Sequence, residues 1–95
     1  MIEVRQTEAF IEWLSRISDS SAARIVTRIR RIEIGNFGDA KSVGGGVSEL
    51  RIDYGSGFRV YFTRRGSTIV ILLCAGDKKT QRRDIAKAQQ MAKEV

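Results

Sequence analysis

The stretch GVSELRIDYGSGFRVYF, residues 46–62, decides the fold of this sequence. Within it, residues 47–53 and residues 58–64 largely alternate apolar and polar side chains, which is the period of a β-strand with one buried face. The residues between them, Tyr54-Gly55-Ser56-Gly57, are typical of a turn. We therefore predict two adjacent antiparallel strands that direct one face toward a core, namely the face of Leu50, Ile52, Val60 and Phe62.

The segments after this hairpin predict a further strand and a helix. Arg65-Gly66 forms the next tight turn. Thr68–Ala75 is apolar on both faces, which predicts a central strand that is covered twice. Gly76–Lys79 is then a loop, and Thr80 is the expected cap of a last helix that runs to about Lys93.

The N-terminal half predicts one strand and a pair of helices. Ile2–Gln6 alternates as a short strand, and Thr7 can cap a helix that follows it. Ser18-Asp19-Ser20-Ser21 interrupts the helical spacing and offers the cap of a second helix, Ala22–Ile34. Two helices with so short a link favour an antiparallel hairpin. Gly35–Gly46 is predicted to be a loop.

These elements predict an α+β domain that spans residues 1–95. Their order is strand, helix, helix, three strands and helix. The N-terminal helical hairpin is expected to pack on one face of a mostly antiparallel four-stranded sheet. The other face of the sheet is expected to be an open polar surface along residues 47–64.

Composition excludes several classes of function. The chain has no His, which excludes Ser-His-Asp hydrolysis, His-based ribonuclease chemistry and His-ligated zinc. Its one cysteine, Cys74, cannot form an intrachain disulfide, which fits a reducing compartment. No apolar signal core is visible, and the longest uncharged apolar run, Ile69–Ala75, is far shorter than the ~20 residues of a membrane span. We expect a cytoplasmic protein without membrane contact, and neither a metal nor a cofactor.

The charge is basic, with 17 Lys and Arg against 11 Asp and Glu and a net charge of +6. Such an excess suggests an acidic partner such as nucleic acid, although arginines also serve solubility alone. Side-chain alternation puts a carboxylate, two guanidiniums and a phenol on the polar face, namely Glu49, Arg51, Arg59 and Tyr61. An ordinary polar sheet face with Glu–Arg cross-strand pairs is the alternative interpretation.

Two further groups of cations allow two interpretations each. Four cations stand at the start of the last helix, where a phosphate would meet free backbone N–H groups as well as Lys78, Lys79, Arg82 and Arg83. The alternative there is a solvated charge run. Arg24, Arg28 and Arg31 share one face of the second helix, which is either an ordinary exposed face or a surface for an acidic partner or an RNA backbone.

Two segments together resemble the RelE/ParE superfamily of type II toxins, in particular its phage-derived addiction-module killer proteins, a HigB-like branch. They are residues 46–62, quoted above, and residues 72–86, LLCAGDKKTQRRDIA. The resemblance implies the RelE-like order β-α-α-β-β-β-α and a toxin paired with a small DNA-binding antitoxin, through which it meets operator DNA. RelE-like members enter the ribosomal A site and cut mRNA, so an endoribonuclease, or mRNA interferase, that inhibits translation is implied.

Two other activities remain open within this resemblance. ParE-type members are not nucleases and poison DNA gyrase by binding it. A decayed cassette, whose product only binds its antitoxin and operator DNA, is the third possibility.

The resemblance also implies roles for individual residues. Arg51 and Arg59 would stabilise the phosphate, with Lys78 as the cation of the loop. Glu49 stands where RelE has Lys, which makes it a candidate base or the mark of a weaker enzyme, and Tyr61 is a candidate proton donor. The His of many HigB-type members and the helical Tyr of some relatives have no counterpart here. Further RNA contacts are expected from Lys79, Arg82, Arg83, Arg64 and Arg65.

Overall fold

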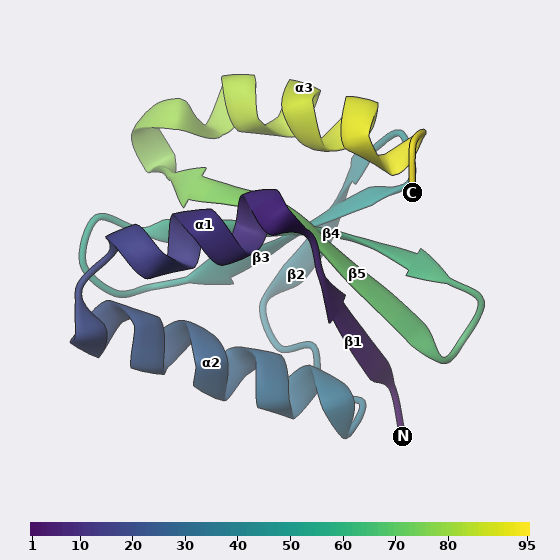
Figure 1. Ribbon diagram of the computed structural model, residues 1–95, viewed down its shortest axis with the longest axis horizontal. Helices are drawn as coiled ribbons and strands as arrows, with labels where there is room; N and C mark the ends of the chain where they lie inside the picture. The colour runs from purple at the N-terminus through teal and green to yellow at the C-terminus, as the bar shows by residue number, and fades with distance from the viewer.

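The computed structural model describes residues 1–95 as five strands, three α-helices and one 3-10 turn (Figure 1). The elements follow one another along the chain as β1 (Glu3–Gln6), α1 (Glu8–Arg16), α2 (Asp19–Glu33), β2 (Ala40–Gly44), β3 (Val47–Ile52), β4 (Phe58–Arg65), β5 (Ile69–Asp77), the 3-10 turn η1 (Lys78–Thr80) and α3 (Gln81–Ala92). The predicted α+β class and helical hairpin are confirmed, and the predicted element order holds apart from one additional strand. None of the helices is long and apolar enough to cross a membrane.

The sheet has five strands in the order β1-β5-β4-β3-β2, not the four that were predicted. β1 runs parallel to β5, and the other neighbours are antiparallel. The additional strand, β2, lies inside the predicted loop Gly35–Gly46 and pairs with β3. The loop prediction was wrong there because Gly45 and Gly46, two of the five glycines that suggested a loop, form only the tight β2–β3 turn, where Gly45 has a φ of +63°.

Helices cover both faces of the sheet (Figure 1). α1 and α2 pack on one face over the larger core, whose largest buried side chains include Phe10, Ile25, Leu50 and Phe62. α3 packs on the opposite face of β3, β4 and β5, where Ala88 joins a second core with Tyr61 and Leu73. The expectation of an open polar face was therefore wrong, because α3 lies over it. The prediction that the apolar strand is covered twice is confirmed for β5.

Side-chain caps fix where the helices and the turn η1 begin. Thr7 Oγ1 accepts from Phe10 N, and Ser18 Oγ accepts from Ser21 N, so both predicted caps are confirmed. Thr80 does not cap the last helix as predicted. Asp77 caps the preceding turn η1 instead, because its carboxylate lies one turn earlier and accepts two N–H groups.

Candidate functional site

The polar face of β3 and β4 brings four of the predicted site residues together. Strand pairing aligns Glu49 with Tyr61 and Arg51 with Arg59, in the register that the alternation predicted. Glu49 and Tyr61 are fully buried, whereas the side chains of Arg59 and Arg51 are 11% and 37% exposed. The four groups thus form one cluster that is closed at its base under α3 and opens to solvent through the arginines.

Glu49 is the centre of this cluster. Its Oε1 accepts from Arg51 Nε and from Arg59 Nη1, both at 3.3 Å. Its Oε2 accepts from the Tyr61 hydroxyl at 3.1 Å and from Gln81 Nε2 at 2.7 Å. Four donors therefore saturate a carboxylate that lies outside the reach of water.

This environment keeps Glu49 ionised. Burial by itself would raise the pKa of the carboxyl, but the hydrogen bonds from Gln81, Tyr61 and Arg51 and the charge of Arg59 outweigh it and lower the pKa. A buried carboxylate with a lowered pKa and four donors is poorly suited to accept a proton from a ligand. The geometry instead suits a positioning residue that fixes the two guanidiniums.

Tyr61 is equally constrained. Burial, the negative charge of Glu49 and the hydrogen bond to it all raise the pKa of the phenol. The hydroxyl stays protonated and donates inward to Glu49 at 3.1 Å. The side chain is therefore placed to hold Glu49, while the predicted role of proton donor would need it to reach a ligand.

Beside this cluster lies a cavity of about 290 Å³ at the end of β3. It collects three cations from separate parts of the chain, namely Arg51 on β3, Arg59 on β4 and Lys78 on η1. Its other walls are Asp39, Ile52, Asp53, Gly57 and Phe58. A small cavity lined by several guanidinium and ammonium groups can hold a phosphate by charge-assisted hydrogen bonds.

The backbone around Lys78 explains how it reaches this cavity. Gly57 has a φ of +80°, which favours glycine, and a Cβ at this position would lie 3.5 Å from Lys78 Cδ. The Lys78 side chain thus packs along the β3–β4 turn. The neighbouring Lys79 is exposed and does not line the cavity.

Two N–H groups just before α3, where a phosphate was expected to bind, are already occupied. Asp77 Oδ1 accepts from Lys79 N at 2.9 Å and from Thr80 N at 3.3 Å. An anion from solution would have to displace this carboxylate. Arg82 and Arg83 are exposed on the first turn of α3, and Arg83 Nε lies 3.9 Å from Asp84 Oδ1.

Arg64 and Arg65 do not join the other cations. They lie at the far end of β4, five and six residues beyond Arg59, which corresponds to about 17 and 20 Å along a strand. Figure 1 shows the β4–β5 turn at the opposite end of the molecule from the start of α3. The Arg64 guanidinium lies 4.6 Å from the centre of the Phe37 ring, in a cation–π contact.

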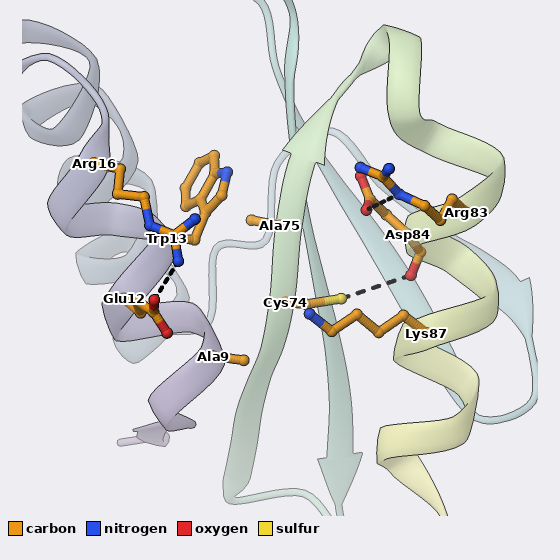
Figure 2. Close-up of a pocket in the computed structure, with 9 residues that line it drawn as sticks. All are labelled: Ala9, Glu12, Trp13, Arg16, Cys74, Ala75, Arg83, Asp84 and Lys87. Atoms are coloured by element: carbon orange, nitrogen blue, oxygen red, sulfur yellow. Dashed lines mark hydrogen bonds and ion pairs between the residues drawn. The ribbon is translucent and has the colours of Figure 1, made fainter.

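A larger cavity of about 440 Å³ lies between α1 and α3 across β5 (Figure 2). Its charged groups are mostly paired with one another, because Arg16 bonds to Glu12 and Arg83 lies beside Asp84. Burial, with a smaller contribution from Asp84, raises the pKa of the Cys74 thiol in its wall to about 11, so the thiol is not ionised at neutral pH. Three cations line this cavity as well, but Arg16 and Arg83 are largely exposed and each lies beside a carboxylate on its own helix, which makes it the weaker candidate.

Three polar residues that line the smaller cavity or contact Glu49 beside it were not predicted as site residues. Asp53 could have been found, because its place in the alternation of residues 47–53 puts it on the face of Arg51. Asp39 lay in the segment that was predicted to be a loop. Gln81 gave no signal, because a glutamine at the start of a helix is ordinary until the fold places it against Glu49.

Comparison with known proteins agrees with this architecture. A protein-family model described as phage derived protein Gp49-like (DUF891) matches residues 12–93. An uncharacterized protein of Haemophilus influenzae is 48% identical over 95 residues, which cover 99% of this chain and 96% of the relative.

A solved structure shows the same fold in a distant protein. A free-state structure of the E. coli toxin RelE, carrying two arginine-to-alanine mutations, superposes with a TM-score of 0.76 at 8% identity, and the match covers 96% of both chains. The predicted RelE-like fold is thereby confirmed, and the predicted phage-derived character agrees with the family model.

Proposed function

This chain belongs to the family of phage-derived Gp49-like proteins, and we propose that it is the toxin of a type II toxin–antitoxin system that cleaves mRNA on the ribosome. One observation supports this function above the others. Arg51, Arg59 and Lys78, which come from two strands and the turn after a third, line one cavity of about 290 Å³ in a RelE fold.

The proposed reaction is transfer of the phosphoryl group within the RNA strand. The ribose 2′-oxygen attacks the adjacent phosphorus, the bond from phosphorus to the 5′-oxygen breaks, and a 2′,3′-cyclic phosphate and a 5′-hydroxyl result. Arg51 and Arg59 bind the phosphate and stabilise the negative charge that develops in the transition state. Glu49 and Tyr61 position these two guanidiniums from below.

The two proton transfers are assigned to groups that line the cavity. The Lys78 ammonium donates a proton to the departing 5′-oxygen, and a carboxylate at the rim, Asp39 or Asp53, accepts the proton of the 2′-hydroxyl. The ribosome contributes by holding the mRNA in the conformation that aligns attacking and leaving oxygens. Action on ribosomes would place the protein in the cytoplasm, with a small DNA-binding antitoxin as partner and operator DNA bound through it.

Induction of the protein in a bacterial host tests this proposal. Primer extension should reveal cuts inside translated codons, and Arg51→Ala and Arg59→Ala should abolish both cuts and growth arrest. Arg30→Ala removes an exposed arginine of α2 that lines neither cavity described above and is the matched control. Circular dichroism of each variant verifies the fold, and full toxicity of both site variants would refute the assignment.

Binding of DNA gyrase without cleavage is the second candidate function. The balance of charge favours it, because Arg51, Arg59 and Lys78 face the negative charges of Glu49, Asp39 and Asp53. A site so neutralised holds a phosphate less strongly than three free cations would. The two functions separate on the first process to stop after induction, which is translation for the nuclease and DNA replication for the gyrase poison. Absence of any growth effect would favour a protein that only binds its antitoxin and operator DNA.

A further inference from the structure

We propose that Arg24, Arg31 and Tyr54 form a second subsite, which binds the same RNA strand next to the nucleotide held by the Arg51–Arg59 cavity. This inference rests on the proposed function, because it names the path of the RNA beyond the reacting phosphate. The RNA would pass from the polar side of the sheet, around the end of β3, onto the side of α2.

The two subsites adjoin in space. A cavity of about 460 Å³ lies between α2 and the end of β3 and is lined by Arg24, Thr27, Arg28, Arg31, Ile52, Asp53 and Tyr54. It shares Ile52 and Asp53 with the 290 Å³ cavity that holds Arg51, Arg59 and Lys78. Figure 1 shows the β3–β4 turn, the α1–α2 turn and the start of α3 at one end of the molecule. A single RNA strand that extends from one cavity therefore reaches the other cavity next.

The arginines of this second cavity have no carboxylate partner. None of Arg24, Arg28 and Arg31 forms an ion pair within 4.0 Å, and Asp53 is the only acidic residue of the lining. Burial and the nearby charge of Arg31 lower the pKa of Arg28, while Asp39 opposes them more weakly. The cluster holds uncompensated positive charge, which an anion between the guanidiniums would relieve.

The three arginines differ in what they are free to do. Arg28 donates from Nη1 to the carbonyl of Arg51 at 2.8 Å and from Nη2 to the carbonyl of Phe37 at 3.4 Å. It therefore fastens α2 to the strand residue whose side chain lines the first cavity. Arg24 and Arg31 are exposed and their side chains make no hydrogen bond within the protein, which leaves their guanidiniums available to a ligand.

Tyr54 gives this surface the character of a single-strand RNA site. The Arg24 guanidinium lies over its ring, 4.6 Å from the ring centre, in a cation–π contact. Unpaired RNA bases stack on aromatic rings and on arginine planes, while neighbouring cations contact the backbone phosphates. An acidic protein segment would use the cations and gain nothing specific from the ring, so we assign the surface to RNA.

RNA titrations at several salt concentrations test this assignment. The probe is a short fluorescein-labelled oligouridine whose 2′-hydroxyls are methylated, so that it binds without being cut, and fluorescence anisotropy reports its affinity. Loss of one phosphate contact from a single strand flattens the dependence of log affinity on log salt by about 0.7. Arg24→Gln and Arg31→Gln should each show this change, while Arg30→Gln, on the same helix but outside the cavity, should keep the wild-type slope.

Tyr54→Leu separates stacking from charge. It should weaken binding on the order of tenfold and leave the salt slope unchanged, because the ring contributes no charge. Wild-type slopes for Arg24→Gln and Arg31→Gln, or no binding by the wild-type protein at any salt, would overturn the second subsite. A parallel titration with poly-glutamate tests the alternative. If Arg24→Gln and Arg31→Gln lose affinity for poly-glutamate and keep their affinity for RNA, the surface belongs to an acidic protein and the RNA assignment is overturned.

Growth arrest distinguishes this inference from the function on which it rests. If the second subsite is wrong while the nuclease is right, Arg51→Ala abolishes arrest and the α2 variants bind RNA as the wild type does. If the nuclease itself is wrong, induction leaves mRNA uncut whatever the RNA titrations show.

Discussion

The carboxylate of Asp84 on α3 lies against the backbone of Gly76 on β5, so closely that a Cβ at residue 76 would be 1.9 Å from Asp84 Oδ2. The same Oδ2 accepts from the Thr80 hydroxyl at 2.5 Å. This contact fixes the first turn of α3 on the sheet and thereby places Gln81 over Glu49. Absence of a side chain at residue 76 is thus a condition for the whole site.

Gly76→Ala should destabilise the protein by about 1–3 kcal/mol, because the added methyl group forces a buried hydrogen-bonded carboxylate to move. Urea unfolding measures this cost. Gly66→Ala is the control, since its φ of +61° strains the backbone while no atom lies within 4 Å of the new Cβ. A smaller loss of stability for Gly76→Ala than for Gly66→Ala would contradict the steric interpretation.

Glu49→Ala should cost about 3–5 kcal/mol of unfolding free energy, because it leaves the nearly buried Arg59 without its counter-charge. Chemical denaturation again provides the measurement. Glu3→Ala breaks a comparable Glu–Arg pair whose side chains are 58% and 56% exposed, and it should change stability little. Equal effects of the two substitutions would show that the buried cluster does not stabilise the fold.

The stability of the protein should depend on pH through the carboxylate of Glu49. Hydrogen bonds and arginines more than offset burial and lower the pKa of Glu49 below its ordinary 4.5, so the unfolded chain takes up this proton at a higher pH than the folded one. The contribution of Glu49 to stability is therefore fully present above that ordinary value and declines as pH falls toward the folded pKa. Denaturation midpoints between pH 3 and pH 7 should fall more steeply for the wild type than for Glu49→Gln. Parallel curves would argue against a lowered pKa.

Lys78→Ala should slow mRNA cleavage on programmed ribosomes by about 10²-fold or more, because it removes the group assigned to protonate the leaving oxygen. Lys79→Ala removes the same charge from the next residue, which is exposed and does not line the cavity. Single-turnover rates of the two variants decide the question. If Lys79→Ala slows cleavage as much as Lys78→Ala does, the loss of rate reflects the removal of one positive charge and not the position of Lys78 in the cavity.

Much of this fold follows from local patterns. Alternation with a period of two determines the faces of β3 and β4, and it therefore predicted both the register and the meeting of Glu49 with Arg51, Arg59 and Tyr61. Caps at Thr7 and Ser18 were predictable for the same reason, because each bond spans three residues. The strand β2 was missed because its glycine-rich neighbourhood resembles a loop until β3 supplies a partner.

The tertiary placement of α3 could not be predicted in this way. Gln81 meets Glu49 across 32 residues of chain, and no spacing rule connects a helix start to a strand that far back. Because α3 lies over the polar face of β3 and β4, this face is not the open surface that was expected. It holds the buried carboxylate of Glu49, with Arg51 and Arg59 partly exposed beside it. Arg64 shows the converse error, since a cation near the site in sequence extends along its strand to the other end of the sheet.

The contact between Gln81 and Glu49 also sets an order of events during synthesis. The ribosome makes residues 78–81 after every strand of the sheet, so Lys78 and Gln81 join the site after Glu49, Arg51 and Arg59 have been made. Until then Glu49 lacks its closest donor and the cavity lacks one of its three cations. A nascent chain stalled before this point would thus lack the complete cavity of Arg51, Arg59 and Lys78, and the site proposed for RNA would form only as synthesis of the domain ends.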